Sequence, residues 1–122
     1  MVMFDTNMIL RYLLNDNQSM ADQAEKYLNT EDVCISVEVI AEVVYVLKGV
    51  YRMDRGAIAE TIKGFMELVH CREKDVLNIA LDVFGQRNLD FVDCMLYGYH
   101  QVHHMEIATF DKQLLKLLST SV

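Results

Sequence analysis

Short β-prone runs alternate with longer stretches of helical periodicity along this sequence, and that alternation leaves few folds open to the chain. The runs cover residues 1–4, 33–35 and 107–110, and each leads directly into a polar residue. Apolar residues at helical spacing fill most of the sequence between them. Strands that alternate with helices are typical of a parallel sheet covered on both faces and entered by right-handed crossovers. We therefore expect an α/β protein with a three-layer α/β/α architecture.

The expected helices are marked by polar caps and apolar faces. Ser36, Asp54 and Asp90 each precede such a stretch, and Ser and Asp are favoured at the N-cap. The stretch over residues 37–51 is apolar almost all round, which predicts a central helix covered on most sides. Residues 70–73 are expected to form a short edge strand. Other helices are expected near residues 8–13, 18–28, 54–69, 76–85, 90–102 and 114–118.

The chain of 122 residues has room for one domain, which we assign to residues 1–122. Hydrophobic residues make up 52% and proline is absent, so a disordered or collagen-like chain is excluded. No apolar run approaches the roughly 18 residues of a membrane-spanning helix, and the N-terminus lacks a secretion signal pattern. We expect a cytoplasmic protein with no membrane partner. The three cysteines form no CxxC pair and are expected in the core: Cys34, Cys71 and Cys94.

The charge balance is acidic. Eleven Lys and Arg residues against eighteen Asp and Glu residues give a net charge of −7. This charge argues against a protein that binds polyanions through a broad basic face, so any nucleic-acid role must be local or metal-assisted. Five cations are candidates for local phosphate contacts, although a solvated surface position is the favoured interpretation for each: Arg11, Lys48, Arg52, Arg55 and Lys112.

Four acids are out of place for a solvated surface. Asp5 and Asp111 each follow a β-prone run directly, and ligands of open parallel sheets bind at the carboxyl ends of the strands. Glu42 and Asp93 lie inside apolar helical stretches. A buried, unpaired carboxylate is costly, so each needs a partner, a proton or a cation. One hard divalent cation shared by all four would satisfy them.

Three of the four acids also have a purely structural interpretation. Asp111 fits the N-cap of the last helix, and Asp93 fits the acidic position of a capping box. Asp5 fits a turn residue that bonds the nearby backbone. Glu42 has no cap or turn to explain it, whereas Glu38 is assigned as an ordinary first-turn acid.

The histidines offer a different site. His100 and His104 stand four residues apart on an expected helix, with His103 beside them, as in some zinc sites. Neither a Glu next to the first His nor a third ligand at a recognisable spacing is present. Helix-end solvation or compensation of the helix dipole is therefore the favoured interpretation.

The four acids lie in four short motifs that follow one another along the chain. These motifs are Phe4-Asp5-Thr6-Asn7, Ile35-Ser36 followed by Glu42, Leu89-Asp90-Phe91-Val92-Asp93, and Ala108-Thr109-Phe110-Asp111-Lys112. Each motif is weak by itself, but in their order and spacing they resemble the PIN domains and, more narrowly, the VapC-type ribonuclease toxins. The resemblance covers nearly the whole chain.

This resemblance implies a parallel sheet of order 3-2-1-4(-5), although only residues 119–122 remain for the final edge strand. It implies metal-dependent hydrolysis of RNA phosphodiesters by an acidic pocket that binds Mg²⁺ or Mn²⁺. The implied pocket consists of Asp5, Glu42, Asp93 and Asp111, with Asn7, Thr109 and Asp90 as supports.

The toxin resemblance also implies a cognate antitoxin, and we expect a homodimer. A basic arm of the antitoxin would pair with the acidic pocket, and its apolar segment is expected on residues for which ordinary core is the alternative: Ile9, Leu13, Ile58, Ile62 and Phe65. A PIN-like or receiver-like binding or signalling module without nuclease activity is the alternative function. A phosphorelay receiver domain needs a phosphate-accepting Asp at the end of its third strand. The candidate here is Asp54, and no apolar strand precedes it.

Overall fold

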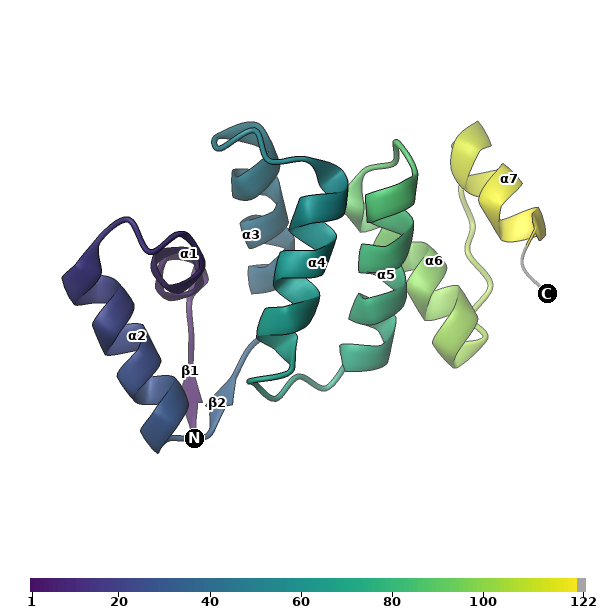
Figure 1. Ribbon diagram of the computed structural model, residues 1–122. Helices are drawn as coiled ribbons and strands as arrows, with labels where there is room; N and C mark the ends of the chain where they lie inside the picture. The colour runs from purple at the N-terminus through teal and green to yellow at the C-terminus, as the bar shows by residue number, and fades with distance from the viewer. Residues whose placement is uncertain (121–122) are drawn as a thin grey trace.

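The computed structural model describes residues 1–120 and consists mainly of helices (Figure 1). Seven helices and two short strands follow one another in these residues. In chain order they are β1 (Val2–Met3), α1 (Thr6–Leu14), α2 (Gln18–Thr30), β2 (Val33–Cys34), α3 (Val37–Gly49), α4 (Arg55–Met66), α5 (Lys74–Gln86), α6 (Phe91–His103) and α7 (Lys112–Thr120).

The expected three-layer α/β/α architecture with a sheet of order 3-2-1-4(-5) is wrong. Within the described part of the chain the sheet has two strands, β1 and β2, which pair in parallel with Val2 opposite Val33. His70 adds a single parallel bridge to Cys34 in place of the expected edge strand over residues 70–73. The helices therefore pack mainly on one another.

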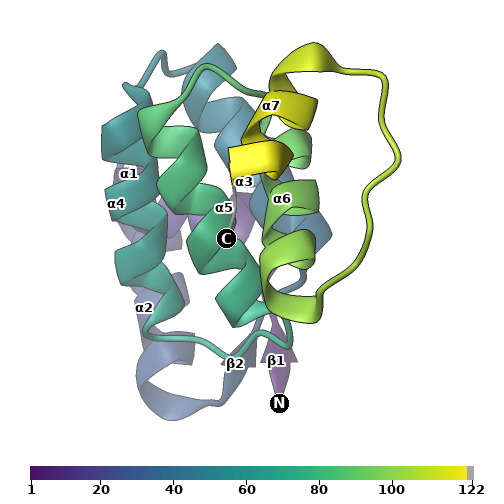
Figure 2. The same ribbon diagram turned by 90° about the vertical axis from the view of Figure 1, so that its right-hand side faces the viewer.

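The expected strand over residues 107–110 is absent because no strand of the described chain pairs with it. The connection between α6 and α7 bows away from the helices (Figure 2), and Phe110 is fully exposed. β-branched residues favour a strand only where their side chains pack against neighbours. The final edge strand was expected in residues 119–122. Ser119 and Thr120 instead end α7, and residues 121–122 lie outside the described residues.

The expected helices are confirmed, with local caps that explain where several begin. The Ser36 hydroxyl accepts a hydrogen bond from the backbone N–H of Val39 (3.3 Å), as an N-cap of α3 should. Asp54 and Asp90 hold the N-cap positions of α4 and α6 without a side-chain capping bond. Asp54 therefore begins a helix, and no strand of the described chain precedes it directly.

The core is centred on α3, α4, α5 and α6, which stand side by side (Figures 1 and 2), and it extends to buried residues of α1, α2, β2 and α7. Burial of each large aliphatic side chain contributes about 1.5–3 kcal/mol to folding. Helix α3 is less covered than its apolar sequence predicted, because one of its faces remains exposed to solvent. The largest fully buried residues of these helices are Ile40, Leu47, Ile58, Ile62, Met66, Leu77, Leu81 and Phe84.

The expectation that all three cysteines lie in the core holds for Cys94 alone. Cys94 is buried, and this burial raises the pKa of its thiol to about 12, so the thiol stays protonated and unreactive. Cys34 and Cys71 are half-buried and form no disulfide. Across residues 1–120, every helix is too short or too polar to cross a membrane.

Candidate functional site

Three acids gather where α6 and α7 begin. Asp90 is the N-cap of α6, Asp93 lies in its first turn, and Asp111 directly precedes α7. Partial burial raises the pKa of Asp93, and the negative charges of Asp111 and then Asp90 raise it further. The structure therefore brings two of the four predicted acids, Asp93 and Asp111, within electrostatic range of each other. The capping box that was the alternative for Asp93 is not formed, because the Asp90 side chain makes no capping bond.

Asp111 is held in place by hydrogen bonds at the start of α7. Its Oδ1 atom accepts from the backbone N–H of Leu114 (2.8 Å), so the N-cap interpretation of this residue is confirmed. The backbone N–H of Asp111 in turn donates to the hydroxyl of Thr109 (3.0 Å). Thr109 thus supports the loop that carries Asp111, in a turn rather than at the end of a strand.

Asp5 and Glu42 come together through a residue that the sequence did not single out. Asp5 is the N-cap of α1, and its Oδ1 atom accepts from the backbone N–H of Met8 (2.9 Å). The hydroxyl of the next residue, Thr6, donates to Oε1 of Glu42 in the middle of α3. Asp5, Asn7 and Glu42 are all exposed, so the expectation that apolar neighbours bury Glu42 is wrong.

The four predicted acids thus form two pairs, Asp5 with Glu42 and Asp93 with Asp111. Within residues 1–120, no three His, Cys, Asp or Glu side chains lie close enough to hold one metal ion together. The donor chemistry nevertheless suits a hard cation, because carboxylate oxygens are the ligands that Mg²⁺ prefers and this ion keeps several waters.

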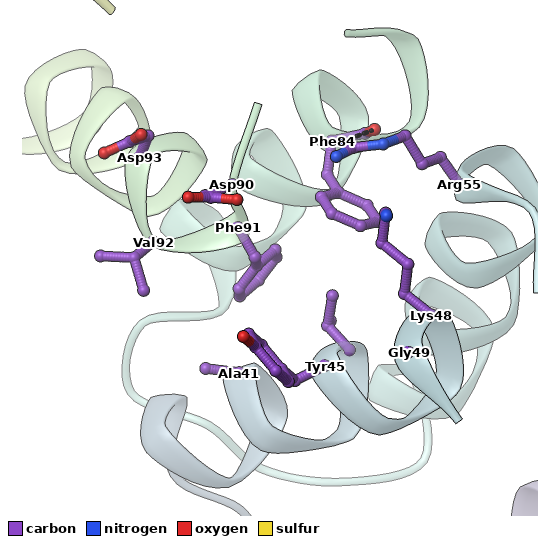
Figure 3. Close-up of a pocket in the computed structure, with 11 residues that line it drawn as sticks. Ala41, Tyr45, Lys48, Gly49, Arg55, Phe84, Asp90, Phe91, Val92 and Asp93 are labelled. Atoms are coloured by element: carbon purple, nitrogen blue, oxygen red, sulfur yellow. Dashed lines mark hydrogen bonds between the residues drawn. The ribbon is translucent and has the colours of Figure 1, made fainter. Parts of the chain in front are cut away.

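A groove of about 550 Å³ lies beside the Asp90 and Asp93 cluster, between α3 and α6 (Figure 3). Ala41 and Tyr45 line it from α3, and Phe91 lines it from α6. Tyr45 is 81% exposed. The helical spacing of Glu38, Glu42 and Tyr45 is the sequence signal that could have revealed the exposed face of α3. The apolar residues around these three positions hide it.

Arg55 closes one end of the groove and is fixed by the backbone rather than by an acid. Its Nη1 atom donates to three carbonyl oxygens, and its guanidinium stands 4.3 Å from the centre of the Phe84 ring. The three carbonyls belong to Phe84 (3.2 Å), Arg87 (2.7 Å) and Leu89 (2.8 Å), directly before Asp90. Arg55 therefore ties α4 to the segment that leads into the acidic cluster.

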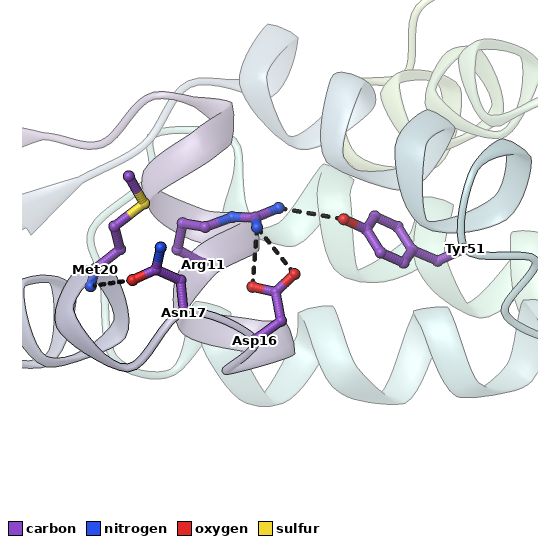
Figure 4. Close-up of polar contacts among 5 residues, drawn as sticks. All are labelled: Arg11, Asp16, Asn17, Met20 and Tyr51. Atoms are coloured by element: carbon purple, nitrogen blue, oxygen red, sulfur yellow. Dashed lines mark hydrogen bonds and ion pairs between the residues drawn. The ribbon is translucent and has the colours of Figure 1, made fainter.

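Of the other candidate cations, Arg11 is also engaged (Figure 4). Its Nη1 atom donates to both carboxylate oxygens of Asp16 (2.9 Å each), and its Nη2 atom donates to the hydroxyl of Tyr51 (3.2 Å). These bonds give Arg11 a structural role at the end of α1. Lys48, Arg52 and Lys112 are all exposed, and Lys48 also lines the groove.

The histidines have partners that explain them without a metal. Nδ1 of His100 bonds the carbonyl oxygen of Met105 (2.8 Å), and Nε2 of His103 bonds Oε2 of Glu73 (2.8 Å). His104 is the C-cap of α6, with a left-handed backbone (φ 58°). The helix-end interpretation of these residues is therefore the one that the geometry favours over a zinc site.

The residues expected under an antitoxin segment are mostly core. Ile9, Ile58, Ile62 and Phe65 are buried, and Leu13 is half-buried. Their alternative interpretation as ordinary core residues holds for the four buried side chains, which offer no surface to a partner.

Comparison with known proteins gives one match, which extends over most of the chain. The family model described as the PIN domain matches residues 2–117. No curated protein and no solved structure matches the sequence.

Proposed function

The chain belongs to the PIN domain family, and from that premise we propose that it is an endoribonuclease dependent on Mg²⁺ or Mn²⁺. PIN domains are generally nucleases that use divalent metal ions. The proposed site consists of Asp5, Glu42, Asp93 and Asp111. The observation that carries the proposal is the raised pKa of Asp93 beside two further carboxylates, an arrangement that a cation or a proton would relieve.

Three of the proposed ligands, Asp5, Glu42 and Asp111, have side chains that hydrogen bonds already orient. The capping bonds of Asp5 and Asp111 engage the Oδ1 atom of each carboxylate, and a carboxylate has a second oxygen that can face a cation. Asp93 and Asp111 are the pair best placed to share an ion, with Glu42 and Asp5 as the second pair. A bound divalent cation would supply Lewis acidity and neutralise charge that grows on the phosphate.

The residues of the chain then supply proton transfer. Water attacks the phosphorus atom of the RNA phosphodiester, and the proton of that water passes to the carboxylate of Asp93. Asp93 lines the groove beside the other acids, and this position suits its carboxylate to the role of proton acceptor. The bond from phosphorus to the 3′ oxygen breaks, and this oxygen takes a proton from solvent. The products are a 5′-phosphate and a 3′-hydroxyl.

The proposal extends to the biological role, in which the protein is the toxin of a toxin–antitoxin pair, a homodimer held inactive by a cognate antitoxin. The net charge of −7 and the clustered carboxylates favour a partner with a basic arm, because an Arg or Lys side chain pairs with carboxylates as a cation does. Copurification from the native operon tests this role. An antitoxin that inhibits equally well after truncation of its basic residues would disprove inhibition at the acidic site.

Cleavage of a structured RNA by the purified protein tests the enzymatic proposal. We expect cleavage with Mg²⁺ or Mn²⁺ and none in EDTA. Asp5→Asn and Asp93→Asn should abolish cleavage while the circular dichroism spectrum stays unchanged. Glu38→Gln is the matched control, because Glu38 lies one turn before Glu42 on the same face of α3. Metal-independent cleavage, or cleavage that survives Asp93→Asn, would overturn the proposal in favour of a binding module.

A further inference from the structure

We propose that the groove between α3 and α6 binds one unstacked base of single-stranded RNA, with the base on the ring of Tyr45 and its phosphate on Lys48. This inference rests on the proposed function, because it names the form of RNA that the acidic site receives. It adds a subsite that lies beside the acids and uses none of them for recognition of the base.

Tyr45 has the position and the exposure of a stacking platform. The residue is 81% exposed, and its ring projects into the groove across from Phe91 (Figure 3). The groove between them is lined by apolar atoms of Ala41 and Val44. Aromatic side chains bind single-stranded nucleic acid by stacking on bases, and every base has a face that can stack. The groove should therefore accept any base, provided that the base is unpaired.

Lys48 supplies the charge that a phosphate needs. It lies three residues beyond Tyr45 on α3, a rise of about 4.5 Å, and extends along the groove toward Phe84 (Figure 3). No ion pair found within residues 1–120 involves Lys48. The other cation of the groove, Arg55, is already bound to three carbonyls, so the phosphate contact falls to Lys48.

The order of side chains along α3 fits a nucleotide next to the reaction site. Glu42, Tyr45 and Lys48 follow one another at intervals of three residues, as a proposed metal ligand, an aromatic ring and a cation. Asp90 and Asp93 face the same groove from α6. The volume of about 550 Å³ falls within the range of about 300–1,000 Å³ of small-ligand sites, which is enough for one base and its sugar.

A basic peptide is the competing occupant, and Lys48 disfavours it at the end of the groove where Tyr45 lies. Asp90 and Asp93 would attract an Arg or Lys side chain at one end, but Lys48 would repel it at the other. A nucleotide places an uncharged base between these ends and its anionic phosphate beside Lys48. The observations therefore favour single-stranded RNA over a basic peptide.

Fluorescence of RNA that carries 2-aminopurine measures the subsite directly, because stacking on an aromatic ring quenches this base. The titration is carried out in EDTA, so that the RNA stays intact. We expect wild-type protein to quench the single strand and not the same base within a duplex. Tyr45→Ala should abolish quenching and raise the dissociation constant about tenfold, whereas Tyr45→Phe should keep both. Tyr27→Ala, on α2 and away from the groove, is the matched control.

Lys48→Met provides a second measurement that does not depend on the ring. It should weaken binding of every sequence alike and lower the slope of log K against log salt by about 0.7. Lys116→Met, on α7, should leave both quantities unchanged. Equal RNA affinity of wild type and Tyr45→Ala, an unchanged salt slope for Lys48→Met, or binding of a basic peptide that depends on the ring of Tyr45 would each overturn the inference.

A parallel cleavage assay separates this inference from the proposed nuclease activity. Quenching that depends on Tyr45 together with no cleavage in Mn²⁺ would support the subsite and refute the enzyme. Cleavage in Mn²⁺ with the same KM for wild type and Tyr45→Ala would support the enzyme and refute the subsite. If both proposals hold, Tyr45→Ala should raise KM about tenfold and leave kcat nearly unchanged for an unstructured substrate.

Discussion

The hydroxyl of Thr6 donates a hydrogen bond to a carboxylate oxygen of Glu42, and this contact joins the first turn of α1 to the middle of α3. Thr6 directly follows Asp5, whose carboxylate caps the same helix. Two acids that are 37 positions apart in the sequence are therefore connected through one side chain. The same contact gives Glu42 a neutral partner, which a mid-helix acid on an apolar helix otherwise lacks.

Removal of the Thr6 hydroxyl should lower stability measurably. Thr6→Val keeps the shape of the side chain and loses the donor, so the free energy of unfolding in urea should fall by about 0.5–1.5 kcal/mol. Thr6→Ser keeps the donor and should lose less. If Val and Ser variants unfold at the same urea concentration, the hydrogen bond contributes nothing to the fold.

The raised pKa of Asp93 predicts how its replacement changes stability with pH. The folded protein holds a proton on Asp93 at pH values where the unfolded chain has lost it, so the ionised carboxylate destabilises the fold above its raised pKa. Asp93→Asn should therefore raise Tm at pH 7. This gain should shrink as the pH falls and vanish below about 4, where Asp93 is protonated in both states.

Asp75→Asn is the matched control for this measurement. Asp75 lies in the first turn of α5, as Asp93 does in α6, but away from the acidic cluster. The loss of a negative charge near a helix N-terminus should lower Tm slightly at pH 7. A lower Tm for Asp93→Asn at pH 7 as well would show that the dipole outweighs burial and repulsion at this position.

The helices were predictable because their signals are local. Ser36 caps α3 within three residues of the donor that it satisfies, and the apolar spacing of α4 is visible inside one segment. The strand over residues 107–110 depends instead on a partner distant in the sequence. Without such a partner its β-prone residues remain in a loop, and Thr109 bonds the backbone of Asp111 in a turn.

The candidate site was predictable in composition but not in arrangement. Asp5 and Asp111 follow β-prone runs and also precede helices, so the end of a strand and the N-cap of a helix occupy the same position in the sequence. Both side chains make capping bonds, and only Asp5 follows a strand in the described chain. The solvent face of α3 was missed because two apolar residues, the buried Val44 and the half-buried Val46, flank Tyr45 and mask the periodicity.

Two glycines should respond in opposite directions to replacement by alanine. A Cβ atom at Gly98 would lie 2.7 Å from the carbonyl oxygen of Val76, which shows how closely α5 and α6 approach, whereas a Cβ atom at Gly64 meets nothing within 4 Å. Gly98→Ala should lower the free energy of unfolding by about 1–3 kcal/mol through overpacking. Gly64→Ala should raise the free energy of unfolding by about 0.5–1 kcal/mol, because alanine is more favourable than glycine at an exposed position inside a helix. Urea denaturation that ranks Gly98→Ala at or above wild type would contradict the close helix contact.

Arg55 should matter for metal binding although it touches no proposed ligand. Its guanidinium binds the carbonyls of Phe84, Arg87 and Leu89, and it thereby fixes the segment that leads into Asp90 and Asp93. Arg55→Met leaves these carbonyls without their donor and should cost about 2 kcal/mol of stability, while Arg55→Lys should cost less because an ammonium group can still reach one of them. Calorimetric titration with Mn²⁺ under conditions where both variants stay folded should show weaker binding for Arg55→Met than for Arg55→Lys. The exposed Arg72 provides the control, since Arg72→Met removes the same charge next to Glu73, which bonds the last residue of α6 rather than the acidic cluster at its start. Equal Mn²⁺ affinities for Arg55→Met and Arg72→Met would mean that the net charge of the protein, rather than the position of the acidic cluster, determines metal binding.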